Sequence, residues 1–132
     1  MTTRAWDHVQ AFALGLPRAV EDIPRGELVV KVDHPPRRMA NGLVYGPMFL
    51  WLGRRKAPVP AVSVKLKASY DQAVAVGRAT PMTMSGLGQW GWLTVPLAGV
   101  DLDLLCDWID ESYRNVAPKK LVAELNQVLS AT

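Results

Sequence analysis

Three segments in the first half of the chain alternate apolar and polar residues with the period of a β-strand, and no helical pattern separates them. They cover residues 27–33, 43–52 and 61–67. A period of two places alternate side chains on opposite faces of a sheet. Parallel strands need long crossover connections, whereas consecutive strands joined by loops pair antiparallel. The pattern therefore predicts an antiparallel sheet.

Helical spacing of apolar residues marks both ends of the chain. It predicts a first helix that ends near Leu16, a helix that Asp101 caps, and a last helix that begins at Pro118. Between them we expect a polar connection over 18–26, a short helix over 70–78 capped by Ser69, and a strand over 92–97. Each strand has one polar face, so the helices should cover one side of the sheet only. The order α-β-β-β-α-β-β-α-α predicts an α+β two-layer sandwich with about five antiparallel strands.

Length and composition fit one domain that spans residues 1–132. The chain has 132 residues, of which 49% are hydrophobic, enough for a single core. It has one cysteine, Cys106, so an internal disulfide is impossible and a reducing compartment is favoured. The polar start is unlike a signal peptide, and the longest apolar run, 43–52, is too short to span a bilayer. We expect a cytoplasmic protein that does not associate with membranes.

Gly86, Gly88 and Gly91 spell the G-x-G-x-x-G pattern of dinucleotide-binding sites. Such a site needs a strand, then the glycines, then a helix whose N-terminus meets the pyrophosphate. Here the glycines precede the strand-like segment 92–97. We therefore interpret them as residues of a tight turn, where glycine supplies a positive φ or room for a close approach.

No pattern in the sequence indicates catalysis, a cofactor or a metal. Cys106 lies near the apolar stripe of a predicted helix and is interpreted as a buried structural thiol. The two histidines, His8 and His34, show no metal-ligand spacing. Asp110 and Arg114 have the i, i+4 spacing of an ion pair on a helix surface. We expect a protein that is not an enzyme.

Basic residues concentrate in the middle of the chain. Residues 31–78 contain nine basic and two acidic side chains, although the whole chain carries a net charge of only +3. The strand phases place Lys31, Lys65 and Lys67 on the open sheet face with Phe49, Trp51 and, by extension, Trp90 and Trp92. Cations between aromatic rings can neutralise phosphates and stack on bases. The candidate nucleic-acid-binding residues are Lys31, Arg37, Arg38, Arg54, Arg55, Lys56, Lys65, Lys67, Trp51 and Trp90.

Several segments, in order, resemble the MmcQ/YjbR family of small bacterial proteins. The most specific is 108–121, Trp-Ile-Asp-Glu-Ser-Tyr-Arg-Asn-Val-Ala-Pro-Lys-Lys-Leu. The others are Trp-Asp-His-Val at 6–9, Leu-Gly-Leu-Pro at 14–17, Glu-Asp-Ile-Pro-Arg-Gly-Glu at 21–27, Val-Val-Lys-Val at 29–32, Met-Phe-Leu-Trp-Leu-Gly at 48–53, Ser-Val-Lys-Leu at 63–66 and Gly-Leu-Gly-Gln-Trp-Gly-Trp-Leu-Thr-Val at 86–95. Together these segments extend over nearly the whole chain.

The resemblance implies a fold similar to CyaY (frataxin) and to secretion chaperones, and it implies DNA binding. It brings no catalytic residues. The segment 86–92 belongs to a glycine-rich branch of the family. That branch usually has a lysine where this chain has Gln89, and often a tryptophan where it has Arg25. The missing cation weakens the DNA-binding interpretation at that position.

Two hypotheses from different classes follow. The first is a non-enzymatic module that binds DNA without sequence specificity, through the basic sheet face and loops. The second is a protein- or peptide-interaction module of the secretion-chaperone type, in which a homodimer would use exposed aromatic residues and a sheet edge. A small-molecule binder is a third alternative and would need a pocket near Trp51, Trp90 and Trp92.

Overall fold

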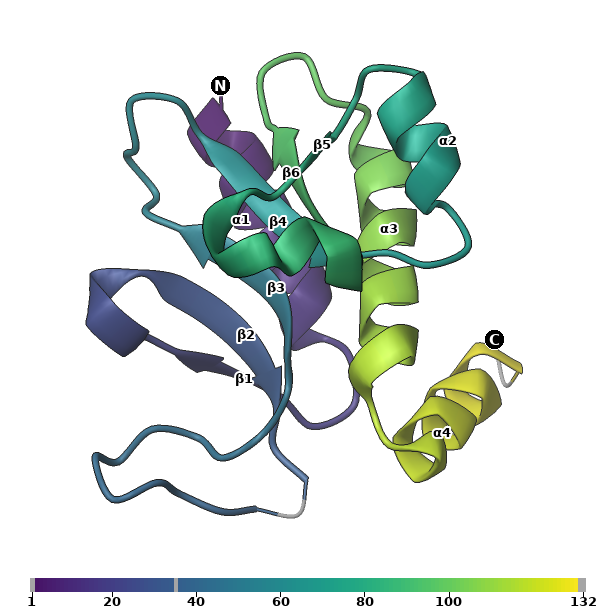
Figure 1. Cartoon of the computed structure of the whole chain (residues 1–132). Helices are drawn as coiled ribbons and strands as arrows, with labels where there is room; N and C mark the ends of the chain where they lie inside the picture. The colour runs from purple at the N-terminus through teal and green to yellow at the C-terminus, as the bar shows by residue number, and fades with distance from the viewer. Residues whose placement is uncertain (1, 35, 131–132) are drawn as a thin grey trace.

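The computed structural model describes residues 2–34 and 36–130, and its central feature is an antiparallel sheet (Figure 1). The sheet has six strands in the order β1-β2-β3-β4-β6-β5. The elements are α1 (Thr2–Leu14), β1 (Ala19–Asp22), η1 (Pro24–Gly26), β2 (Leu28–Val32), β3 (Met48–Gly53), β4 (Ala61–Lys65), α2 (Tyr70–Ala75), β5 (Thr80–Pro81), η2 (Met84–Trp90), β6 (Trp92–Pro96), α3 (Leu102–Val116) and α4 (Lys119–Ser130).

Helices α1 and α3 contact each other and β3, and they enclose the core against one face of the sheet. The strands contribute branched and aliphatic residues that are fully or nearly fully buried, among them Val30, Leu50, Val64 and Leu93. Trp6 anchors α1, because its indole N–H donates to the carbonyl of Leu52 at 2.9 Å. The predicted α+β sandwich with an antiparallel sheet is confirmed.

The edge strand β1 is where the prediction from sequence was wrong. Residues 18–26 were expected to be a polar connection, but Ala19–Asp22 pairs antiparallel with β2. The four residues, Ala-Val-Glu-Asp, contain too little alternation to indicate a strand. The strand forms because β2 offers an unpaired backbone edge, and the sheet therefore has six strands instead of about five.

The third strand is shorter than the expected 43–52 and its side-chain phase changes along it. β3 begins at Met48, and Val44 forms only an isolated bridge with Arg38. The β2–β3 register shifts between Val30 and Lys31, so Phe49 has no directly opposed partner. An inserted residue of this kind breaks the simple alternation of side chains between the two faces of the sheet. Phe49 is consequently buried against Tyr113 of α3, and its predicted place on the open face was wrong.

Ser112 of α3 joins β3 to β4 at a point where the two strands separate. Their direct pairing ends at Leu50 and Val64. One step further, the Ser112 hydroxyl accepts the N–H of Lys65 at 2.8 Å and donates to the carbonyl of Phe49. This buried hydroxyl replaces a ladder hydrogen bond, since an unpaired backbone group inside a protein is costly. Helix α3 is thereby fixed to the end of β4.

Two more side chains of α3 hold the backbone that follows β4. The Glu111 carboxylate accepts the N–H groups of Lys67 and Ser69 and the hydroxyl of Ser69. The Asn115 amide donates to the carbonyl of Lys65. The Ser69 side chain therefore binds α3 and does not cap α2 as the sequence predicted, and α2 ends at Ala75. These bonds set the position of residues 65–69.

The sheet face opposite α1 and α3 was expected to be open, but it is partly covered. Figure 1 shows η2, in green, in front of the sheet and α1 behind it. Trp92 and Ser63 are buried on this face, and the Ser63 and Thr94 hydroxyls are hydrogen-bonded across β4 and β6. The alternation predicted for β4 was correct. This face is nevertheless not open, because η2 covers it and keeps much of the solvent away.

Ser112→Ala tests the bridge between β3 and β4. The variant leaves a buried N–H and a buried carbonyl unpaired, so we expect the free energy of unfolding to fall by about 2–3 kcal/mol. Ser63→Ala is the matched control, because its hydroxyl bonds only another hydroxyl, and we expect a loss of about 1 kcal/mol or less. Urea unfolding followed by circular dichroism measures both. Equal losses would contradict the bridging role.

Candidate nucleic-acid interface

A groove lies where the end of β4, the start of α2 and the ends of η2 and α3 meet. Its volume is about 800 Å³. It combines cations, aromatic rings and amides, and it is lined by Lys65, Leu66, Lys67, Tyr70, Asp71, Gly88, Gln89, Trp90, Gly91, Arg114 and Asn115. The sequence identified Lys65, Lys67 and Trp90 as candidates, and the structure brings all three to this one groove. We call it the β4 groove.

The glycines of η2 build one wall of the β4 groove. A Cβ on Gly88 would lie 2.7 Å from the carbonyl oxygen of Met82, and one on Gly91 would lie 2.5 Å from that of Leu66. Gly91 also has a φ of +99°, a left-handed conformation that suits glycine. The predicted role of the glycines in a turn and a close approach is confirmed. The turn is a 3₁₀ helix between β5 and β6, with no phosphate-binding helix after it.

The charge in the β4 groove is mainly positive. Three cations, Lys65, Lys67 and Arg114, face one carboxylate, that of Asp71. Arg114 is already bonded to Asp110, as the i, i+4 spacing predicted, and to Asn126. Neither lysine forms an ion pair within residues 2–34 and 36–130. The two ammonium groups are therefore available to an anionic ligand.

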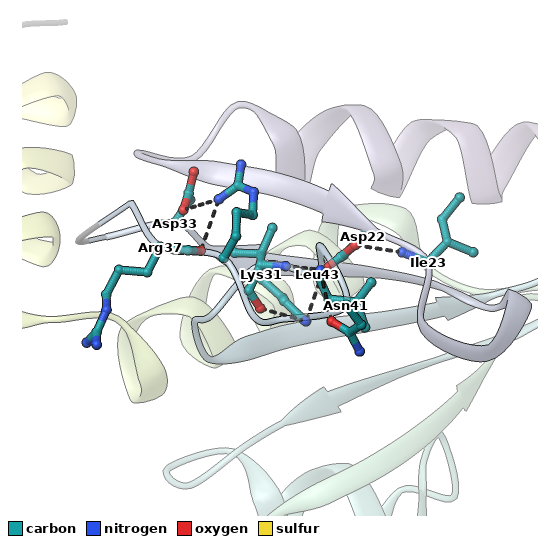
Figure 2. Close-up of polar contacts among 9 residues, drawn as sticks. Asp22, Ile23, Lys31, Asp33, Arg37, Asn41 and Leu43 are labelled. Atoms are coloured by element: carbon teal, nitrogen blue, oxygen red, sulfur yellow. Dashed lines mark hydrogen bonds and ion pairs between the residues drawn. The ribbon is translucent and has the colours of Figure 1, made fainter.

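The segment of residues 33–34 and 36–47, which we call the arm, carries the candidate cations Arg37 and Arg38, and a third candidate, Lys31 of β2, binds to it (Figure 2). Lys31 donates to the Asp22 carboxylate at 3.1 Å and to the carbonyl of Val44 at 3.0 Å. Arg38 pairs with Asp33 at 3.1 Å. Arg37 lies over the ring of Tyr45, 4.9 Å from its centroid. These basic side chains hold the arm together and to β1 and β2.

Asp22 is the centre of the arm's attachment. Its carboxylate accepts hydrogen bonds from the N–H groups of Val44 and Ile23 and from Lys31 (Figure 2). Burial opposes ionisation, but these hydrogen bonds and the charge of Lys31 outweigh it, so the pKa of Asp22 is lowered. The side chains of Lys31 and Asp22 are only 12% and 13% exposed. Lys31 thus lies in a largely buried pair and does not face the β4 groove.

The basic loop between β3 and β4 is a third, separate cluster. Arg55 forms a bidentate pair with Asp7 of α1, with both N–O distances at 2.8 Å. Arg54 and Lys56 are exposed, and neither pairs with a described carboxylate. This loop precedes β4, whereas the β4 groove follows it, so the two lie at opposite ends of that strand. The candidate cations do not form one continuous surface.

The aromatic candidates also lie in different places and do not form one surface. Trp90 is 65% exposed at the end of η2. Trp51 is half-buried, and its indole N–H donates to Glu27 at 2.7 Å. It lines a separate hollow of about 360 Å³ with Met48, Met84 and other residues of β2 and η1. Trp92 is buried. Of the predicted aromatic face, Trp90 is therefore the tryptophan that is mainly exposed to solvent.

Sequence reasoning did not identify the other polar side chains that line the β4 groove as site residues: Tyr70, Asp71, Gln89, Arg114 and Asn115. Gln89, Arg114 and Asn115 lie in segments that carry the family resemblance, and Arg114 also has the i, i+4 spacing with Asp110, but neither signal indicated a shared groove. Tyr70 donates from its hydroxyl to the carbonyl of Gly88 at 3.1 Å and so ties α2 to η2. Its position depends on that contact across the groove, which no local spacing indicates.

The remaining groups that could react or bind a metal are Cys106 and the histidine and acidic side chains. Cys106 is buried as predicted, and burial together with Asp103 and Asp107 raises the pKa of its thiol. Among the described side chains, no group of three or more His, Cys, Asp or Glu residues could hold a metal ion. Within the same residues, no helix combines the length and the apolar character needed to cross a bilayer.

The comparisons with known proteins agree with this architecture. Residues 14–115 match the model of the YjbR family. The chain belongs to the YjbR family. No curated protein matches the sequence. Among solved structures, the YjbR-family chain is similar to the Deinococcus radiodurans protein DR2400, described as a DUF419 domain, with a TM-score of 0.62 and 21% identity. That match covers 94% of this chain and 86% of the other.

The family and the structural neighbour confirm the fold and the resemblance seen in the sequence. At 21% identity, the likeness to DR2400 carries the fold alone. Neither the family name nor the neighbour's description assigns a ligand or a reaction. The function of this YjbR-family chain therefore has to be argued from its own residues.

Asp22→Asn tests the attachment of the arm. The variant leaves the Lys31 ammonium without its anion in a largely buried position, so we expect unfolding to become easier by about 2–4 kcal/mol at neutral pH. Because the folded pKa of Asp22 is lowered, the difference from wild type is fully present above the usual value of 3.8 and shrinks as the pH falls below it. Denaturation at several pH values measures this. Asp7→Asn, which breaks an exposed pair, is the control and should change little.

Gly91→Ala tests the wall of the β4 groove. The new Cβ would clash with the Leu66 carbonyl in a left-handed backbone, so we expect a loss of at least about 3 kcal/mol in the free energy of unfolding. Gly77→Ala is the control, since Gly77 has a φ of +72° but open space around it. We expect it to cost about 1–2 kcal/mol. Comparable losses in the two variants would show that the close approach at Gly91 is unimportant.

Proposed function

We propose that this chain is a non-enzymatic DNA-binding protein that contacts DNA without sequence specificity through the β4 groove. One observation carries the proposal: two lysines that form no ion pair with any described residue lie in one groove with an exposed tryptophan. A solvent-exposed indole beside free ammonium groups suits a ligand that offers both π-faces and phosphates. Nucleic acid has both.

Electrostatics supports this assignment at the groove. Lysine contacts phosphate as a point charge and carries no information about base sequence. Each phosphate that Lys65 or Lys67 neutralises would release counterions, so the affinity should fall steeply with salt. The modest net charge of +3 predicts weak binding at physiological ionic strength.

The DNA-contacting surface that we propose is smaller than the sequence suggested, because the other basic residues are paired or lie outside the β4 groove. Lys31, Arg38 and Arg55 are each bonded to a carboxylate inside the fold. Arg37, Arg54 and Lys56 remain exposed but lie outside the β4 groove. They would add contacts only to a DNA segment long enough to reach beyond the groove.

The described polar groups around the β4 groove support a binding role more than a catalytic one. The Glu111 carboxylate already accepts three hydrogen bonds from the segment after β4. Those bonds keep the pKa of Glu111 low although burial opposes ionisation. The Tyr70 hydroxyl is bonded to a backbone carbonyl. A general base or nucleophile needs a free, activated group, and these groups are engaged in structure.

A second candidate function rests on the hollow beside Trp51. Methionine side chains adapt to varied apolar partners, and Met48 and Met84 flank this hollow. This would suit the alternative of a protein- or peptide-interaction module, or a small apolar ligand. Met84→Glu would then abolish that binding and leave DNA binding unchanged, and light scattering would test for the homodimer.

Lys65→Glu combined with Lys67→Glu tests the DNA-binding proposal. Fluorescence anisotropy with labelled DNA should show binding near 50 mM salt, and the double variant should lose about tenfold or more in affinity. The slope of log affinity against log salt concentration should become shallower by an amount that corresponds to about two phosphate contacts.

Arg4→Glu combined with Arg78→Glu is the matched control. It makes the same change in net charge at two exposed positions outside the β4 groove, and we expect a much smaller loss. If wild type fails to bind at low salt, or if both double variants weaken binding equally, the groove is not a DNA site.

A further inference from the structure

We propose that the β4 groove selects unpaired nucleotides, with one base stacked on Trp90 and the neighbouring phosphates on Lys65 and Lys67. The inference rests on the proposed nucleic-acid binding and specifies its ligand as a single strand. It follows from how Trp90 is presented and how the two lysines are held.

Trp90 is an isolated, exposed platform. Its side chain is 65% exposed, the largest exposed fraction among the tryptophans and tyrosines that the structure describes. No ring, cation or hydrogen-bond partner engages its indole within residues 2–34 and 36–130. An exposed face of an aromatic ring can accept a stacking partner. A large apolar ring left in water beside free cations is the arrangement found at sites that bind bases.

The backbone that carries Trp90 is held by hydrogen bonds on both sides of it. The N–H of Gly88 donates to the carbonyl of Met82 at 2.9 Å, and the N–H of Leu66 donates to the carbonyl of Gly91 at 2.8 Å. From the opposite side, Tyr70 binds the carbonyl of Gly88. The residues on both sides of Trp90 are therefore fixed to three different segments. Because this backbone is held before a ligand binds, stacking would cost little backbone conformational entropy.

Lys65 and Lys67 are held at a defined spacing beside this platform. The α3 side chains Ser112 and Glu111 bind their N–H groups. Lys65 is the last residue of β4 and Lys67 lies in the bend just after it, and both line the β4 groove. The two ammonium groups can therefore contact separate phosphates of one strand that passes the Trp90 ring.

A duplex cannot use the site in the same way. Its bases are stacked on each other, so it presents base edges in its grooves and phosphates on its outside. A base reaches an indole face only if it is unpaired or flipped out of the helix, which costs free energy. A duplex would keep the phosphate contacts and lose the stacking. Since stacking on an aromatic side chain contributes about tenfold to a hundredfold in affinity, a single strand should bind more tightly.

DNA and RNA single strands share the chemistry that this site would recognise, an unpaired base joined to phosphodiesters. The experiment therefore uses labelled 12-residue oligo(dT), oligo(U) and a 12-base-pair DNA duplex with the full chain at low salt. Thymidine monophosphate serves as a fourth ligand. We expect the single strands to bind about tenfold or more tightly than the duplex and the monophosphate. Titration should also quench tryptophan fluorescence.

Trp90→Ala and Trp90→Phe test the stacking, and Val76→Ala, at an exposed position just after α2, is the control. Trp90→Ala should lose about tenfold in affinity for single strands with little change for duplex, and Trp90→Phe should keep part of the affinity but lose the quenching. Val76 is exposed and lies outside the β4 groove, so its variant should bind as wild type does.

The outcomes separate the two proposals. If duplex binds at least as well as the single strands, or if Trp90→Ala binds both as wild type does, the single-strand inference is overturned. DNA binding then stands, provided that the lysine double variant loses it. If the monophosphate binds as tightly as the 12-mers, the site recognises mononucleotides and the inference is again wrong. If no polynucleotide binds at low salt, the proposed function fails and this inference fails with it.

Discussion

The Ser112 hydroxyl is the contact on which the rest of the structure depends. It fills a gap between two separating strands by accepting the Lys65 N–H and donating to the Phe49 carbonyl. Glu111 and Asn115 continue this row of bonds along the backbone after β4. One face of α3 therefore supplies hydrogen bonds that a neighbouring strand would otherwise supply. This arrangement opens the end of the sheet and creates the β4 groove without leaving buried backbone groups unpaired.

The same fold divides its basic residues between structure and solvent. Carboxylates neutralise Lys31, Arg38 and Arg55, and these pairs fasten the arm and the β3–β4 loop to the body of the protein. Lys65 and Lys67 are held through their backbone, so their side chains need no partner within the fold. A count of charges along the sequence cannot distinguish these two uses. The interface that we propose is consequently smaller than the basic middle of the chain.

Much of the fold was predictable because it is encoded locally. The alternation of Val62, Val64 and Leu66 against Ser63 and Lys65 marked β4 and its core face correctly. The side chain of Asp101 accepts the N–H of Leu104, as expected of a helix cap. Strand β1 and the inward turn of Phe49 were missed for a shared reason. The first needs the edge of β2, and the second needs the register shift opposite Val30, so both depend on a partner strand.

The sequence by itself determined the α+β class, the antiparallel sheet, the family and the role of the glycines, because each is written in short-range spacing or in an ordered set of segments. Only the tertiary structure decided which tryptophan is exposed and which lysines are free. η2 folds over the sheet face, where Trp92 is buried, and it ends at Trp90, which is left in solvent. That outcome depends on contacts of Gly88 with Met82, which lies just before η2, and of Gly91 with Leu66, which lies just after β4. Exposure is a property of packing between segments, and no local pattern contains it.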